Sequence, residues 1–160
     1  MKQLYISAHN NTSSHIYMRQ KSRINDWRIP MKNEPVFLTD KNHNVILEAI
    51  TGTPNAALPD SLKPFEILEP NTSDGAAEKH VPVIETNGNH VTVKVGSAFH
   101  PMTEDHNIAW VCLQSTAGSI TRVPLNPDCE PVAYFTLEKG DSPKTAFAYC
   151  NLHGFWKTEA

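Results

Sequence analysis

The second half of the chain is a series of short apolar stretches that recur at intervals of about ten to fifteen residues. The stretch "HVTVKVG" at residues 90–96 alternates cleanly, with Val91, Val93 and Val95 expected on one face of a strand. The stretches "NIAWVCLQ", "SITRVPL", "EPVAYFTL" and "KTAFAYC" follow, divided by Gly, Pro, Asn and Asp. We find no convincing amphipathic helix between them. Regularly spaced short strands predict an all-β fold, a β-sandwich over residues 71–160.

A smaller β-rich domain is predicted before the sandwich, over residues 33–70. "PVFLTD" and "NVILEAI" flank the turn-forming "KNHN", which predicts a hairpin, and "FEILEP" predicts one more strand. The following "NTSDGAAEKH" is expected to form a single helical turn capped by Ser73 or Asp74.

Charge is distributed unevenly along the chain. Residues 1–32 carry six basic residues and one acidic residue (+5), and the other 128 carry eight basic and sixteen acidic residues (−8), which together give −3. A basic start is typical of a targeting segment or a nucleic-acid arm. We favour an N-terminal extension without such a role, and expect no nucleic-acid partner.

The composition also bears on location. No apolar run approaches the roughly eighteen residues of a membrane span, and no apolar region typical of a secretory signal follows the start. The three cysteines, Cys112, Cys129 and Cys150, are too few for a disulfide scaffold. We therefore expect a reducing, cytoplasmic location and no membrane association.

The stretch "YCNLHGFW" at residues 149–156 sets Cys150 three positions before His153. One such pair is too small for a zinc-finger site, so it is either incidental or completed from further up the chain. His80 precedes the apolar "VPV", and His100 and His106 frame the turn "HPMTEDH", which can bring both imidazoles to one end of a sandwich. Four imidazoles and one thiolate suit iron better than four-coordinate structural zinc, and leave a sixth octahedral position open.

Three segments carry a resemblance to a known family. "EKHVPVIE", "VKVGSAFHPMTEDHNIAW" and "YCNLHGFWK" closely resemble the signature segments of the superoxide reductase family, the neelaredoxin and desulfoferrodoxin proteins, in register from about Glu69 to Lys157. The resemblance implies an immunoglobulin-like β-sandwich and one mononuclear iron, cycling between Fe2+ and Fe3+, that reduces superoxide. It also implies that His80, His100, His106 and His153 bind the iron in a plane, with Cys150 as the axial ligand.

The same resemblance implies roles for residues beside the iron. Glu78 is similar to a carboxylate that closes over the oxidised iron, and Lys79 to a local positive charge that attracts superoxide. Without the resemblance, they would be read as a capping or solvent-facing carboxylate and a solvated loop lysine. From proximity alone, we expect the backbone amides of Asn151 and Leu152 to hydrogen-bond the Cys150 sulfur.

The N-terminal domain resembles the small iron-binding domain of desulfoferrodoxins, but without its cysteines. Asp40 and His43 stand at the first cysteine pair, and Asp60 and Ser61 near the second. Such ligands cannot build a tetrathiolate site, so we predict a degenerate domain without metal, with a new metal site as the less favoured alternative. The electron must then come from a rubredoxin-like or other small donor, and the resemblance implies a homo-oligomer, a dimer or tetramer.

Two other functions stay open at this point. One is a non-catalytic iron-binding or electron-transfer module of the same fold, which would not need Glu78 and Lys79 at the site. The other is a purely structural sandwich that binds proteins, which would not explain four histidines and a cysteine brought together.

Overall fold

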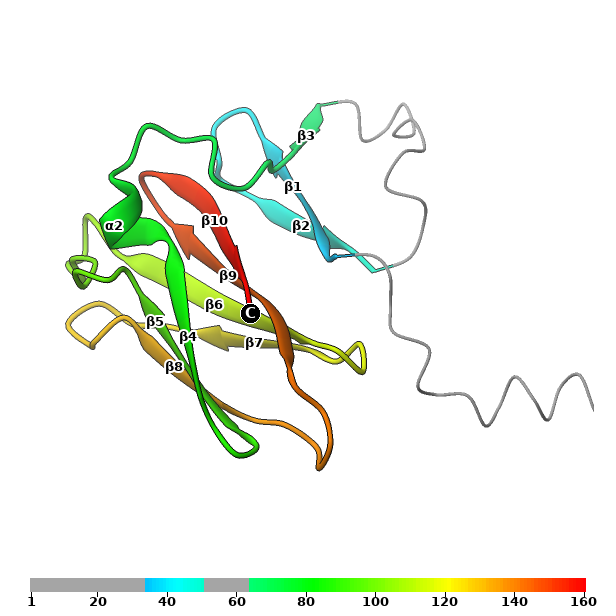
Figure 1. Cartoon of the computed structure of the whole chain (residues 1–160). Coiled ribbons are helices and arrows are strands. Elements are labelled where there is room, and N and C mark those ends of the chain that lie inside the picture. The colour runs from blue at the N-terminus through cyan, green and yellow to red at the C-terminus, as the bar shows by residue number, and fades with distance from the viewer. Residues whose placement is uncertain (1–33, 51–63) are drawn as a thin grey trace, which may run out of the picture. The chain divides into compact units, whose positions relative to one another are not determined.

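The computed structural model describes residues 34–50 and 64–160. The predictions for residues 1–32 and for Asp60 and Ser61 lie outside these residues. Within them the regular secondary structure is β-strands, apart from one helical turn, α2 (Ala77–His80) (Figure 1). The predicted all-β class is confirmed.

In this described part of the chain, ten antiparallel strands form three sheets. The first sheet has the order β2-β1-β3, with β1 at Val36–Asp40, β2 at Ile46–Ala49 and β3 at Phe65–Ile67. The second has the order β4-β5-β8, with β4 at Pro82–Asn87, β5 at His90–Val95 and β8 at Val132–Thr136. The third has the order β10-β9-β6-β7, with β6 at Ile108–Ser115, β7 at Ile120–Pro124, β9 at Pro143–Cys150 and β10 at Gly154–Glu159.

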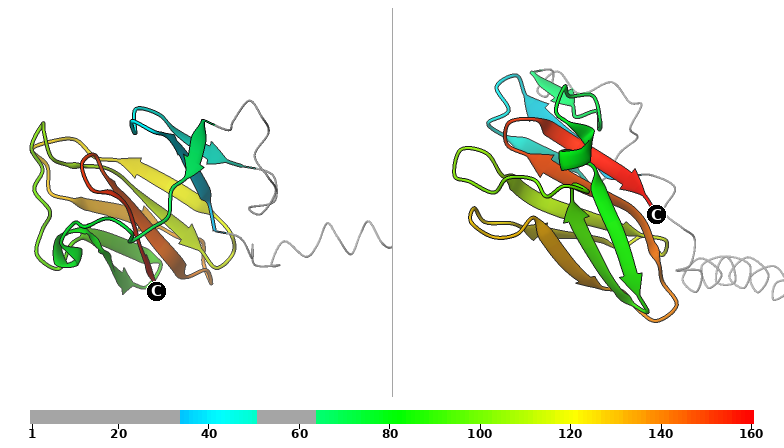
Figure 2. Two further views of the ribbon diagram at one scale, coloured as in Figure 1. Left: turned by 90° about the horizontal axis from the view of Figure 1, so that it is seen from above. Right: turned by 60° about the vertical axis from the view of Figure 1, so that its left-hand side comes forward.

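The sheets containing β5 and β9 face each other and enclose the main core (Figure 2). Val91, Val93 and Val95 of β5 are each at most 1% exposed, as their alternation predicts. They pack against residues of β6, β8 and β9, ending in Cys150. Seven strands arranged as four and three are typical of an immunoglobulin-like sandwich.

A β-bulge sets the side-chain directions of β6. Ile108 pairs with Cys150 and Trp110 with Tyr149, so Ala109 is the extra residue between them. Because of this insertion, Ile108 and Val111 both face the main core although they are an odd number of residues apart. The bulge places Ile108 directly beside Cys150, at the end of the sandwich.

The β1 sheet covers the outer face of the β9 sheet. Phe37 of β1 is 1% exposed and lies in a second apolar cluster with Phe147, Tyr149 and Phe155. Its ring meets those of Phe147 and Phe155 edge-on, with centroids 6.4 and 5.2 Å away. Strand β9 is therefore buried on both faces over residues 146–150, which explains the apolar run "AFAYC".

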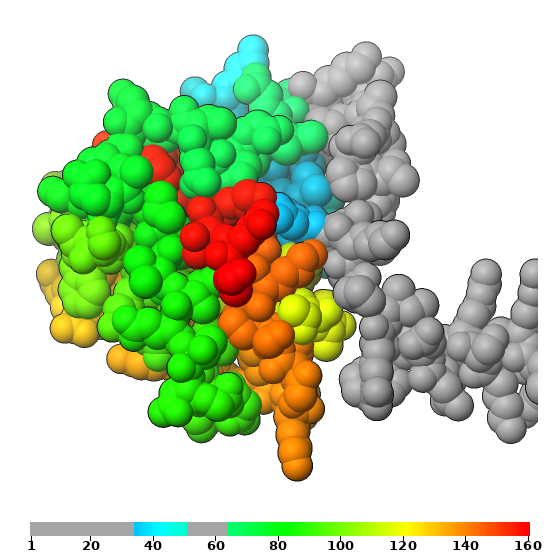
Figure 3. All heavy atoms as spheres, in the orientation of Figure 1, coloured from blue at the N-terminus to red at the C-terminus, as the bar shows by residue number. Residues whose placement is uncertain are grey.

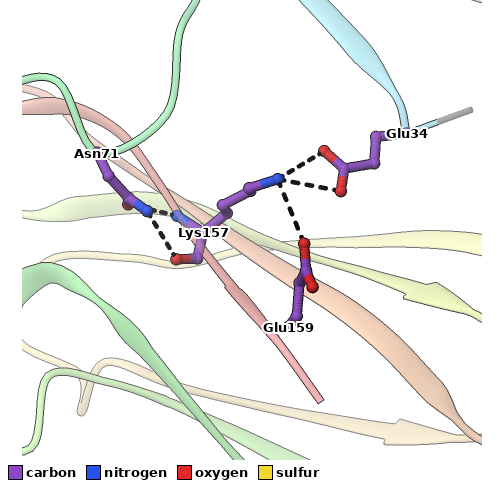
Figure 4. Close-up of polar contacts among 4 residues, drawn as sticks. All are labelled: Glu34, Asn71, Lys157 and Glu159. Carbon is purple, nitrogen blue, oxygen red and sulfur yellow. Dashed lines mark hydrogen bonds and ion pairs between the residues drawn. The ribbon is translucent and has the colours of Figure 1, made fainter.

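Asn71 ties the segment before α2 to the free edge of β10 (Figure 4). Its side chain accepts a hydrogen bond from the Lys157 N–H (2.9 Å) and donates one to the Lys157 carbonyl (3.2 Å), as a neighbouring strand would. Its own N–H donates to the Phe155 carbonyl. Figure 3 shows the consequence, since β10 (red) lies at the surface between the green segment that leads into β4 and the blue β1. The chain that carries α2 is thus fixed against β10.

Three local features differ from the sequence predictions. Strands β4 and β10 were not predicted, although "NGN" before β5 is a strong hairpin signal and Asn87 does pair with His90. The predicted cap of the helical turn was wrong, because α2 starts after Ala76 and has no side-chain cap. Ser73 instead accepts a hydrogen bond from the Gly75 N–H (3.3 Å) within the preceding loop.

No helix within residues 34–50 and 64–160 is long and apolar enough to cross a membrane.

The position of Phe37 leads to a stability prediction. We expect Phe37→Ala to lower the free energy of unfolding by about 3–5 kcal/mol, because it leaves a cavity between two sheets. Chemical denaturation of the full-length, metal-free chain measures this change. Tyr134→Ala is the control, since Tyr134 is 73% exposed on β8 and should cost less than about 1 kcal/mol. Similar losses in the two variants would mean that the β1 sheet is not packed as described.

Candidate metal centre

Five side chains from separate segments meet at one end of the sandwich. They are His80 at the end of α2, His100 and His106 from the β5–β6 loop, Cys150 at the end of β9, and His153 from the β9–β10 turn. Their nitrogen and sulfur atoms all lie within 4.8 Å of one another, so the group could hold a metal ion. Figure 1 shows α2, the β5–β6 loop and the β9–β10 turn side by side at this end.

Two of the imidazoles are oriented by backbone carbonyl groups. His80 donates from Nδ1 to the Ala76 carbonyl (2.7 Å), and His100 donates from Nδ1 to the Pro101 carbonyl (2.5 Å). A neutral imidazole that donates from Nδ1 has an unprotonated Nε2. Both Nε2 atoms therefore present lone pairs to the centre of the group.

These lone pairs point at one another across short distances. Nε2 of His80 lies 3.1 Å from Nε2 of His100 and 3.0 Å from Nδ1 of His153. The two Nε2 acceptors cannot hydrogen-bond each other, so this contact is unfavourable unless a cation lies between them. The Nε2 atom of His106 also indicates a cation here, because it is buried without a hydrogen-bond partner among the described residues. The arrangement fits a metal ion at the centre.

Burial lowers the pKa of three of these histidines. Loss of solvation is the largest cause for His80, His100 and His106, and it lowers the pKa of His100 to about 4. The Nδ1 hydrogen bonds oppose the shift in His80 and His100, and the neighbouring imidazoles add to it. His100 is therefore neutral near pH 7 and can bind a metal without losing a proton.

Cys150 lies at the base of the group with no exposed surface. Burial raises the pKa of its thiol, and backbone amides of His153 and Leu152 oppose this rise. The His153 N–H donates to the sulfur at 3.4 Å. The predicted amide contact agrees, for Leu152, with the effect of that amide on the pKa of the thiol. It is wrong for Asn151, whose N–H donates to the Asn107 carbonyl instead.

Asn151 links the two loops that carry His106 and Cys150. Its side-chain oxygen accepts the Asn107 N–H (2.9 Å), and its side-chain nitrogen donates to the Asp105 carbonyl (3.0 Å). The loop is closed further by Thr103, whose hydroxyl accepts the His106 N–H (3.1 Å). These bonds hold His106 in place independently of a metal.

Glu78 and Lys79 are exposed on α2, directly before the buried His80. The Glu78 carbonyl accepts hydrogen bonds from the Ala98 N–H (3.1 Å) and the Ser97 hydroxyl (3.2 Å), so the backbone is fixed while both side chains face outwards. The Lys79 charge contributes to the lowered pKa values of His80 and His106. Its ammonium group therefore acts electrostatically on the site, and the roles predicted for both residues stay predictions.

The remaining histidines and cysteines of the described residues lie outside the group. His90 is exposed on β5 near the Thr136 hydroxyl. His43 lies in the β1–β2 turn with a φ of 56°. Cys112 is buried in the second apolar cluster, where burial raises the pKa of its thiol to about 11, and Cys129 is exposed.

The sequence did not predict the residues that pack against the proposed ligands. Trp156 stacks on His80, and Gly75 lies against His80, His153 and Trp156. The aromatic frame of "YCNLHGFW" was the available signal for Trp156. No sequence signal marked Gly75 or the Asn151 side chain.

Gly96 provides a test of how α2 is supported. Its φ is 84°, and an added Cβ would lie 2.6 Å from the Lys79 carbonyl oxygen and still closer to that of Ala98. We expect Gly96→Ala to displace α2, lower the metal content and cost about 1–3 kcal/mol through overpacking, beyond the roughly 1–2 kcal/mol of a left-handed residue. Gly140→Ala is the control, since Gly140 has a φ of 89° and open space around it. Metal analysis and denaturation measure both effects, and equal behaviour of the two variants would contradict this account.

Comparison with known proteins gives a consistent result. The desulfoferrodoxin family model matches residues 72–159. A desulfoferrodoxin from Clostridium acetobutylicum is 38% identical over 130 residues, which covers 81% of this chain and 99% of that protein. A protein named superoxide reductase from Pyrococcus horikoshii is 36% identical over 104 residues, covering 55% of this chain and 90% of that protein.

A solved structure extends the similarity to the fold. The superoxide reductase from Treponema pallidum is similar with a TM-score of 0.67 and 35% identity, covering 79% of this chain and all of that chain. Since the Clostridium match covers 130 residues, it must extend well before residue 72. Sequence, fold and the five gathered side chains thus agree, and the chain belongs to the desulfoferrodoxin family.

Proposed function

We propose that this chain is a superoxide reductase, which converts superoxide, one electron and two protons into hydrogen peroxide at a single iron ion. The observation that carries the proposal is the convergence of four imidazoles and one buried cysteine sulfur within 4.8 Å. The proteins that this chain resembles include several named superoxide reductases.

Iron is favoured by the donor set. Four imidazole nitrogens and one thiolate exceed the four ligands of a structural zinc site, and imidazole is a good ligand for iron. We assign His80, His100, His106, His153 and Cys150 as the ligands. Iron held by these residues would supply the electron that reduces superoxide.

Cys150 has the role of setting the electronic character of the site. A thiolate donates electron density more strongly than imidazole. The amides of His153 and Leu152 offset part of the cost of burying its charge. Hydrogen bonds from these amides also reduce the electron density that the sulfur donates to a metal. The turn after β9 therefore adjusts the donor strength of Cys150.

The exposed turn at Glu78 and Lys79 forms the entrance. The chain carries a net charge of −3, which disfavours the approach of an anion in general. Lys79 places a positive charge close enough to affect His80 and His106 electrostatically. In this proposal it attracts superoxide locally, and Glu78 closes the entrance when the metal is oxidised.

The electron comes from an external donor, of rubredoxin-like or other small type. In the β1–β2 turn, Asp40 accepts the Val45 N–H (2.9 Å) and its carbonyl accepts the His43 N–H (2.9 Å). The Asp40 carboxylate thus stabilises the turn by a hydrogen bond and is not needed as a metal ligand. This supports the proposal of a degenerate domain over residues 33–70 without its own metal. We further propose a cytoplasmic homo-oligomer.

The proposal predicts a specific stoichiometry. The full-length chain, loaded anaerobically with ferrous iron, should bind one iron per chain, and each ferrous ion should give one electron to one superoxide, which yields one hydrogen peroxide and no dioxygen. Cys150→Ser should abolish the activity and, in the oxidised form, the thiolate-to-ferric charge-transfer band, whereas Cys129→Ser, at an exposed cysteine, should retain both. Release of dioxygen would indicate dismutation instead, and tight iron binding without superoxide consumption would favour the electron-transfer module.

Lys79 has a testable electrostatic role. We expect Lys79→Ala to slow the second-order reaction with superoxide roughly two- to tenfold at low salt and to weaken its salt dependence, because the local attraction is lost. Pulse radiolysis across ionic strengths measures both effects. Lys94→Ala is the matched control: it removes the same charge on β5, where Lys94 pairs with Glu85. If the two variants react at equal rates, Lys79 has no special role.

A further inference from the structure

Trp156 touches two of the proposed ligands that come from distant parts of the chain. It lies on β10, is 3% exposed, and belongs to neither of the two apolar clusters of the described residues. We infer that Trp156 is a positioning residue of the metal centre, which joins His80 to His153 and strengthens metal binding. The inference rests on the proposed metal site, but not on its reaction.

The first contact is a stack on His80. The indole and imidazole rings are nearly parallel, with an interplanar angle of 22° and centroids 4.8 Å apart. A metal bound at Nε2 draws electron density from the imidazole and leaves its ring partly positive. The electron-rich face of an indole attracts such a ring, as it attracts cations. The stack therefore favours the metal-bound state over the metal-free state.

The second contact is a hydrogen bond to the backbone of His153. The indole Nε1–H donates to the His153 carbonyl oxygen at 2.9 Å. His153 belongs to the turn after β9, whose amides also bond the Cys150 sulfur. The indole thus fixes the turn that carries two proposed ligands, while its face fixes His80 on α2.

Gly75 makes this arrangement possible. A Cβ at position 75 would lie 3.0 Å from His153 Cβ, 3.0 Å from His80 Cε1 and 3.1 Å from Trp156 Cζ2. Only a residue without a side chain fits beside all three groups without displacing them. The loop before α2 therefore closes over the contact between Trp156 and the two histidines.

Variants of Trp156 separate the two contacts. Phenylalanine keeps an aromatic face but lacks the N–H, whereas leucine lacks both. Supporting residues of this kind typically contribute about 10–100-fold to metal affinity. We expect Trp156→Leu to weaken Co2+ binding by roughly that factor, and Trp156→Phe to weaken it by a smaller one. Trp156→Leu should also shift the cobalt absorption bands, which report ligand geometry.

The measurement is Co2+ affinity of the full-length chain, by competition with a chromophoric chelator, together with the denaturation midpoint of the metal-free form. Trp110→Phe is the matched control, since Trp110 stacks on Tyr149 and packs on Phe37 without touching a proposed ligand. We expect this control to lose stability and to retain wild-type cobalt affinity and absorption bands. Wild-type affinity in both Trp156 variants, or an equal loss in the Trp110 variant, overturns the inference. Failure of the wild-type chain to bind cobalt at all overturns the proposed site as well.

Discussion

The mutual approach of unprotonated imidazole nitrogens is the constraint on which the site depends. Two Nε2 atoms that lie 3.1 Å apart, with both Nδ1 atoms already engaged, repel each other unless a cation is present. The fold tolerates this contact because His80 and His100 are held from outside, by carbonyl groups of their own loops. The loops themselves therefore fix much of the ligand geometry, and a cation among these nitrogens would offset their repulsion.

Different elements of the fold position different ligands of the site. The facing sheets of the sandwich provide a rigid end from which β9 delivers Cys150, and the bulge at Ala109 aligns Ile108 beside it. The β9–β10 turn then brings His153 back to the same point, and Asn71 fixes the segment of α2 to β10. Each proposed ligand thus lies at the end of a strand, at the end of α2 or in a short loop, and hydrogen bonds between these segments limit the motion of the group.

Much of this was predictable from the sequence, for identifiable reasons. The core face of β5 was predictable because apolar and polar residues alternate along the whole strand, with Val91, Val93 and Val95 on the buried side. The five gathered residues were found because their motifs resemble those of a known family. Strand β10 was missed since its residues were read only as part of a motif, and the helix cap was placed wrongly because Ser73 bonds within its own loop. Trp156 and Asn151 act through contacts between segments that are distant in the sequence, and no local sequence pattern predicts such contacts. Asn151 was expected to use its amide, whereas its side chain makes the important bonds.

The placement of the β1 sheet has a consequence for how such a chain can change over time. Phe37 fills the outer face of the β9 sheet, and Glu48 on β2 pairs with Arg122, whose guanidinium lies 5.3 Å from the Phe37 and Trp110 ring centroids. Removing this sheet would expose Phe147 and Phe155 to water, whether or not the segment ever binds a metal. Sequence changes in this segment are therefore constrained by the packing of its apolar face, whatever side chains its turns carry.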